Sequence, residues 1–295
     1  MNPAYQKGAE PKLYLMQPSF WSYLWSLLKA AFTGLYQDGC LGIAKGAAYS
    51  ALLSFFPVLT TLAAVLVEAR AEAVSRTIAR LLYDVVPPGT EDTVRTLFVV
   101  HGERPRWLLV LAIVLSVWAA SGAMMSLLEG FRAVYHIPQG RSFLAERGVA
   151  MLLVFTSALP VVAASALIVF GKRGEAYLIQ WLRPNAPSLS GWVLIAGQVL
   201  RFVLASASIV LATAQIYHWG PNRKQSFHQV LPGALLATLL WLFATLVFSW
   251  YVRYVADYNL LYGSVGAGLA LLVWMYVLSV IVLLGCEFNA VRERD

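Results

Sequence analysis

Long apolar runs separated by shorter polar segments dominate the pattern of this chain. Six runs are long enough to cross a bilayer as helices, since about 20 apolar residues span its hydrocarbon core. The predicted spans are Ala44–Val67, Trp107–Leu128, Val149–Phe170, Trp192–Ile216, Val230–Tyr251 and Ser264–Cys286. Because the runs are continuously apolar and do not alternate, we expect helices and not barrel strands. The pattern therefore predicts an all-α polytopic membrane protein with six transmembrane helices.

Two further segments have an amphipathic pattern. Between Ser19 and Tyr36, apolar residues recur at helical spacing opposite serine, lysine and threonine, which is typical of a helix in the membrane interface. The connection 68–106 carries another apolar stripe and predicts a helical extramembrane loop. We therefore divide the chain into an N-terminal segment at 1–43, a six-helix transmembrane domain at 44–286 that includes this loop, and a C-terminal tail at 287–295.

Composition supports a membrane protein. Of the 295 residues, 59% are hydrophobic and 13% are charged, whereas a soluble fold usually needs about a quarter charged residues to wet its surface. The 22 basic residues exceed the 15 acidic ones, giving a net charge of +7. The basic residues occur at most in pairs such as Arg223-Lys224, so we interpret the excess as loop charge at a lipid surface. We expect membrane lipids as partners and no nucleic acid.

The distribution of basic residues favours cytoplasmic termini. If both termini are cytoplasmic, 11 Lys and Arg lie on that side and 10 on the other, six of them in the loop 68–106. Long loops influence orientation little, and without this loop the comparison is 11 to 4. Cys40 and Cys286 would then face a reducing compartment, and we expect them to be unpaired.

One cation lies in the middle of a predicted span. Arg201 is near the centre of the fourth run, where a charged side chain costs about 2.5–3.5 kcal/mol to insert, and no acidic residue lies in the core of any run. The polar residues that share its helix face are Gln198, Ser208 and Gln215. This face either lines a cavity that accepts an anionic group or packs closely against a neighbouring helix.

A similar stripe of small and polar residues lies in the first span. It includes Ser50, Ser54 and Pro57, with Tyr49 beside it and Lys45 near the entry. The same two interpretations apply, namely close helix packing or the lining of a substrate path. In the second interpretation, Lys45 recruits an anionic substrate at the membrane surface.

The sequence contains no recognisable enzyme motif. The four histidines have no metal-ligand spacing, and no GxSxG, Walker A or paired-carboxylate arrangement occurs. We therefore expect no catalytic residue, no metal site, no cofactor and no ATP-driven step.

Four segments resemble, in order, the YihY/virulence factor BrkB family. They are AAYSALLSFFPVLTTLAAVL, SGAMMSLLEGFRAVYHI, IYHWGPNRKQSFHQVLPGA and YNLLYGSVGAGLALLVWMYVLSVIVLLGCEFNA. The resemblance covers Gly39 to Arg292 and implies a six-span inner-membrane protein of bacteria with cytoplasmic termini. Some members are labelled ribonuclease BN, but the lack of a nuclease metal motif and of a basic groove argues against that activity here. The family is also associated with envelope integrity and lipid export.

These observations lead to two hypotheses about function. The first is a non-enzymatic transporter or flippase-like protein for an anionic, lipidic substrate, whose phosphate would supply the negative charge that Arg201 lacks. The alternative is a scaffold protein that docks an envelope partner through the loop 68–106. The scaffold hypothesis requires a closed helix bundle, whereas the transport hypothesis requires a path between the helices.

Overall fold

The structure is a computed structural model that describes residues 20–68, 106–138, 140–185, 187–254 and 263–294. Over these ranges the chain forms seven helices and no strand. Six of them are long and apolar enough to cross a membrane, within Cys40–Leu62, Val110–Val134, Phe143–Ala164, Ile195–Trp219, Phe227–Tyr251 and Gly268–Arg294. The predicted all-α, six-span fold is confirmed. The helices predicted in the loop 68–106, and the docking role proposed for it, fall at positions 69–105, which lie outside the described residues.

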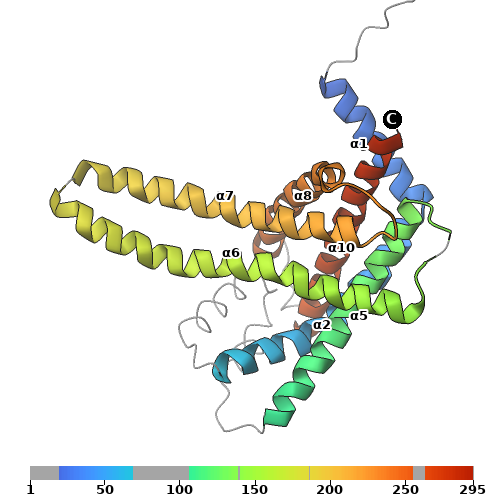
Figure 1. The fold of residues 1–295 in the computed structure, drawn as a ribbon, viewed down its shortest axis with the longest axis horizontal. Helices are drawn as coiled ribbons and strands as arrows, with labels where there is room; N and C mark the ends of the chain where they lie inside the picture. The colour runs from blue at the N-terminus through green and yellow to red at the C-terminus, as the bar shows by residue number, and fades with distance from the viewer. Residues whose placement is uncertain (1–19, 69–105, 139, 186, 255–262, 295) are drawn as a thin grey trace, which may run out of the picture.

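The spans run up and down and leave one end of the molecule rich in polar residues. The helices are α1 (Phe20–Gln37), α2 (Cys40–Glu68), α5 (Arg106–Val134), α6 (Phe143–Asn185), α7 (Pro187–Trp219), α8 (Phe227–Tyr254) and α10 (Gly263–Arg294). The α1–α2 turn, the α5–α6 and α7–α8 connections and the last turn of α10 all lie at the same end (Figure 1). We call this end the terminal face, and define it as residues 38–40, 135–138, 140–142, 220–226 and 290–294.

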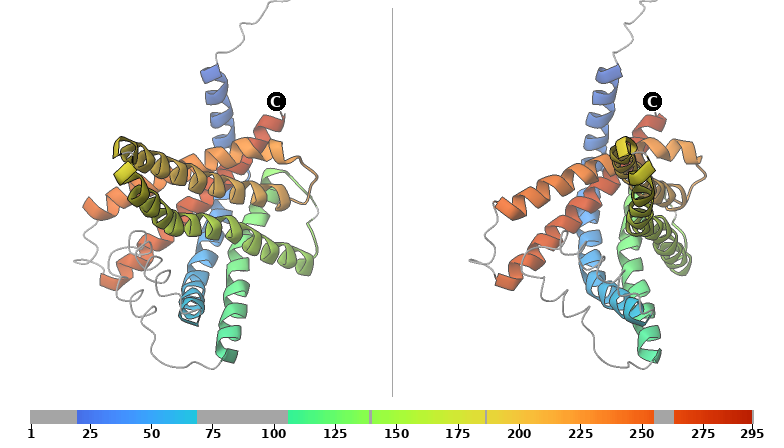
Figure 2. Two further views of the ribbon diagram at one scale, coloured as in Figure 1. Left: turned by 60° about the vertical axis from the view of Figure 1, so that its left-hand side comes forward. Right: turned by 90° about the vertical axis from the view of Figure 1, so that its left-hand side faces the viewer.

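The described spans are splayed and do not form a closed bundle. α2 packs along α5 and α10, and α10 also contacts α1 and α8. α6 and α7 pack against each other, while α6 contacts α5 and α7 contacts α8. Figures 1 and 2 show the α6–α7 pair extending away from α2 and α5 at a steep angle. The span in α7 is the least buried of the six, so most of its surface is available to lipid.

The α6–α7 pair is longer than the sequence predicts. The 43 residues of α6 extend about 65 Å at a rise of about 1.5 Å per residue, roughly twice the thickness of a hydrocarbon core. The sequence places a connection between Phe170 and Trp192, but helix continues through most of it. Pro187 begins α7 at a position where its missing backbone donor is not needed. The pair therefore crosses a bilayer obliquely or extends beyond it.

The best-packed part of the core lies near the terminal face. The rings of Phe131 and Tyr217 are fully buried and meet edge to face, with their centroids 5.7 Å apart. The Tyr217 hydroxyl donates a hydrogen bond to the carbonyl of Val282 at 2.6 Å. α8 and α10 approach closely at Gly233 and Gly285, where a Cβ on either residue would overlap the opposite backbone. Small residues thus allow these two helices into direct backbone contact.

The predicted amphipathic helix is confirmed as α1, but its apolar stripe packs on protein. Leu27, Ala31 and Leu35 are buried in the core cluster that includes residues of α10. The opposite face exposes Trp21 and Trp25, with 77% and 71% of their surface accessible. Tryptophan is favoured at headgroup depth, so the exposed face is the one suited to the membrane interface.

Candidate functional site

The polar residues predicted on α7 lie along a largely exposed helix. Arg201 is half-buried beside Gly171 of α6, where an added Cβ would lie 3.3 Å from Arg201 Cδ. Arg201 also interacts with other groups of the protein, so it is not an isolated cation. Gln198 is exposed, and Ser208 donates to a carbonyl of its own helix at 2.8 Å. Gln215, near the terminal face, has a buried Oε1 that accepts no hydrogen bond from a described residue.

The stripe predicted on α2 faces α5. The Pro57 carbonyl accepts a hydrogen bond from Ser116 Oγ at 2.7 Å. Ser50 lies against Gly122, where an added Cβ would be 3.9 Å from its own Cβ. Ser54 is buried and donates to a carbonyl of its own helix at 2.8 Å. These contacts are those of two closely packed helices joined by hydroxyl hydrogen bonds.

The structure does not bring the two predicted stripes together. α2 packs on α5 and α10, whereas α7 packs on α6 and α8. Lys45 and Tyr49 are exposed on α2. A single path lined by both stripes therefore has no support from their contacts, and the role of each residue as a substrate ligand stays a prediction.

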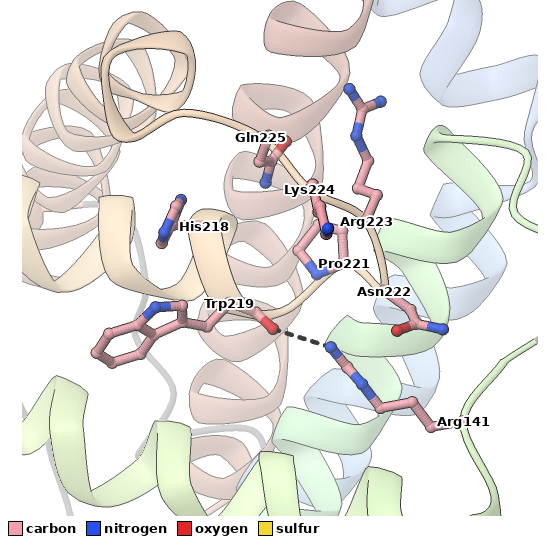
Figure 3. Close-up of a pocket in the computed structure, with 8 residues that line it drawn as sticks. All are labelled: Arg141, His218, Trp219, Pro221, Asn222, Arg223, Lys224 and Gln225. Atoms are coloured by element: carbon pink, nitrogen blue, oxygen red, sulfur yellow. Dashed lines mark hydrogen bonds between the residues drawn. The ribbon is translucent and has the colours of Figure 1, made fainter.

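A basic pocket lies at the terminal face, where α7 ends (Figure 3). Its volume is about 600 Å³, and none of the eight described residues that line it is acidic. Arg141 approaches from the α5–α6 connection, and its guanidinium donates to the carbonyls of Gly220 at 2.9 Å and Trp219 at 3.3 Å. The remaining lining residues come from the end of α7 and the α7–α8 connection, and they are His218, Trp219, Pro221, Asn222, Arg223, Lys224 and Gln225.

Local contacts fix the shape of this pocket. The side-chain amide of Gln225 donates to the Tyr217 carbonyl, which folds the α7–α8 connection back onto the end of α7. Arg223 lies over the Tyr135 ring, 4.3 Å from its centroid, and forms an ion pair with Glu293 of α10. Burial raises the pKa of the Tyr135 phenol well above its ordinary value, so this ring remains neutral under the guanidinium.

One lining cation remains available for a ligand. Lys224 is exposed and forms no ion pair with any residue of the described ranges. The Nδ1 atom of His218 is buried, without a hydrogen-bond partner among the described residues. With Arg141 close by, Lys224 offers hydrogen-bond donors to an anion. Trp219, with 42% of its surface exposed, adds an aromatic surface at the end of a span. The pocket is therefore suited to a ligand with a negative head and an apolar body.

The sequence contains a signal for this pocket. Arg223-Lys224 is one of the few adjacent basic pairs, and it follows His218 within the segment IYHWGPNRKQSFHQVLPGA. By itself the pair indicates only general loop charge. Folding the connection back onto α7 gathers these residues around one hollow, and Arg141 joins them from a distant part of the sequence.

The six-span fold with this polar terminal face defines a polytopic α-helical membrane protein. The family model described as Virulence factor BrkB matches residues 31–295, and the chain belongs to that family. The family resemblance is thereby confirmed.

Individual relatives are moderately similar. The ribonuclease-like protein YfkH of Bacillus subtilis is 29% identical over 63% of this chain and 66% of its own length. A UPF0761 membrane protein of Tolumonas auensis is 25% identical over 97% of this chain and 89% of its own. A UPF0761 membrane protein of Chromohalobacter salexigens is 26% identical over 86% of this chain and 59% of its own length. The chain therefore spans less than two thirds of the length of this relative and of YfkH. No solved structure matches the chain.

Proposed function

We propose that this protein is a transporter or flippase-like protein that moves an anionic lipid between the leaflets of a bacterial inner membrane, without an enzymatic step. The observation that carries the proposal is the basic pocket at the terminal face, with basic side chains, no acidic lining residue and a half-exposed tryptophan. A phosphate headgroup satisfies the cationic donors, and the acyl chains lie on apolar surface.

The exposed surface of α7 supports a path for the lipid. Leu200 and Phe202 are exposed to 58% and 66%, and they flank Arg201 on a span that packs against protein only in part. Arg201 would give the phosphate a second cationic contact at depth, where a charge is otherwise unfavourable. In this proposal the pocket captures the headgroup first, and Lys45 contributes only to attraction at the surface.

The pocket is less suited to cleavage of a phosphodiester. One relative, YfkH, is named ribonuclease-like. Hydrolysis of RNA without a metal generally uses two proton-transfer groups, and the pocket lining contains a single imidazole, His218, without a carboxylate. We therefore propose no nuclease activity for this chain. Because the sequence has no nucleotide-binding motif, a gradient, a partner or mass action would drive movement of the lipid.

The proposal is tested with purified protein in vesicles that contain fluorescent phosphatidylglycerol. The label in the outer leaflet is bleached chemically, and the loss of the remaining fluorescence reports movement of lipid from the inner leaflet. We expect wild-type protein to speed movement between leaflets above the rate of empty vesicles. Lys224→Gln should slow it about 10- to 100-fold, because losing one charge-assisted hydrogen bond costs about 1.5–3 kcal/mol and about 1.4 kcal/mol is a factor of ten. Arg201→Gln tests the deeper contact in the same way.

The matched control is Arg292→Gln. Arg292 is exposed at the terminal face and does not line the pocket, so the variant removes the same charge from the same end of the protein. We expect it to move lipid at the wild-type rate. Equal slowing by Lys224→Gln and Arg292→Gln would show a general surface-charge effect, and unchanged movement in Lys224→Gln would remove the pocket from the proposal.

A further inference from the structure

A buried carboxyl group near the terminal face lacks a hydrogen-bond donor. Glu287, in the last turns of α10, is fully buried, and neither of its carboxylate oxygens accepts a hydrogen bond from a residue that the structure describes. Arg294 Nη1 forms a long ion pair with Glu287 Oε1 at 3.8 Å, which is beyond hydrogen-bonding distance. A carboxylate that is buried without donors costs several kcal/mol, so this arrangement needs a further partner.

The neighbour of Glu287 is a second carboxyl group. Asp38, in the turn between α1 and α2, interacts with it, and contacts through Arg294 and His136 join the two side chains. Gly34 allows α1 to approach α10, because the Glu287 side chain occupies the space that a Cβ on residue 34 would fill. The backbone amide of Asp38 donates a hydrogen bond to the Gly34 carbonyl at 2.8 Å. Asp38 Oδ2 is also buried without a partner in the described part of the chain. Two ionised carboxylates have only acceptors, so a hydrogen bond between them requires a proton.

Groups from several helices surround this pair. The titratable and charged residues that face it are Cys40 of α2, His136 after α5, and Cys286 and Arg294 of α10. His136 Nε2 lies 3.3 Å from Asp38 Oδ1, and Arg294 Nη2 lies 3.3 Å from His136 Nδ1. These two basic side chains border the pair. Among the described residues, no group of three or more His, Cys, Asp or Glu side chains could hold a metal ion. The small positive ligand that fits is a proton.

We propose that Asp38 and Glu287 form a proton-binding site in which the two carboxyl groups hold one proton between them. The site joins the α1–α2 turn to α10, two elements far apart in the sequence. Loss of the proton places two negative charges at this contact and weakens the packing of α1 on α10, with Arg294 and His136 compensating in part. The proposal does not depend on lipid transport.

The test is infrared spectroscopy of the purified full chain, which detects the carbonyl band of a protonated carboxyl group. We expect the wild-type protein to show this band at neutral pH and to lose it as the pH rises. Glu287→Gln and Asp38→Asn should each abolish it, because an amide can donate the hydrogen bond that the shared proton made. Both variants remove a buried charge with little change of shape, and thermal unfolding checks that each is folded.

Glu129→Gln is the control, because Glu129 is an exposed acid on α5 away from the pair. It should leave the band unchanged. Absence of the band from the wild-type protein at neutral pH would overturn the proposal. Persistence of the band in either Asp38→Asn or Glu287→Gln would also overturn it, because the proton would then belong to one residue. Loss of the band in Glu129→Gln would overturn it as well.

Discussion

A single glycine sets the distance between α1 and the buried carboxyl of α10. The methyl group of Gly34→Ala would overlap Glu287 Oε1 and lie 2.8 Å from its Cδ, so a fully buried side chain would have to move. We expect the variant to lose about 1–3 kcal/mol of stability, the usual cost of overpacking. Thermal unfolding in detergent measures the loss.

The comparison for this substitution is Gly148→Ala in α6. An added Cβ at Gly148 meets no atom within 4 Å, and the residue is exposed within a helix. Alanine there should raise stability by about 0.5–1 kcal/mol, because glycine loses more backbone freedom on folding. An equal change of stability in Gly34→Ala and Gly148→Ala would contradict the close contact between Gly34 and Glu287.

Individual residues show why the sequence predicted helices better than sites. The sequence predicts a C-terminal tail at 287–295, and in the structure α10 continues through this segment to Arg294 and buries Glu287. Arg201 was conspicuous because no acid shares its span, yet it interacts with other groups of the protein. Hydropathy describes the average environment of a segment, whereas burial and partners depend on the neighbouring helices.

At the scale of helices, the contact between α8 and α10 depends on one buried amide. Asn289 accepts a hydrogen bond from the Gly233 amide at 2.7 Å and donates to the Val230 carbonyl at 3.0 Å, next to Pro232 inside α8. Asn289→Ala leaves these groups unpaired and should cost about 1–3 kcal/mol, read from thermal unfolding. The control Asn222→Ala, at an exposed position, should unfold at the same temperature as the wild type. If Asn289→Ala loses no more stability than this control, the contact adds no stability.

The helices themselves were predictable because their apolar runs are long and uninterrupted. The cysteine prediction also held, since Cys40 and Cys286 are buried and free. The pairing of helices was not predictable, because the small-residue faces of α2 and α7 look alike in sequence but pack on different neighbours. The extended α6–α7 pair was missed because its middle segment is polar, and polarity marks the end of a membrane span without marking the end of a helix.

At the scale of the whole molecule, the orientation in the membrane is a separate prediction. We propose that the terminal face, with its basic pocket, lies in the cytoplasm, as the distribution of basic residues favours. A green fluorescent protein fused after Asp295 should then fluoresce, and alkaline phosphatase at the same place should be inactive. Active alkaline phosphatase would reverse the orientation and place the pocket on the other side of the membrane.

The open arrangement of the spans agrees better with a lipid path than with a closed scaffold. The α6–α7 pair diverges from α2 and α5 (Figure 2), and α7 exposes apolar side chains along its length and ends at the basic pocket. We propose movement of anionic lipid, and the decisive experiment compares two labelled lipids in vesicles that hold the wild-type protein. We predict that phosphatidylglycerol crosses faster than in empty vesicles and faster than phosphatidylcholine. A rate for phosphatidylglycerol equal to that in empty vesicles would rule out the proposed lipid transport.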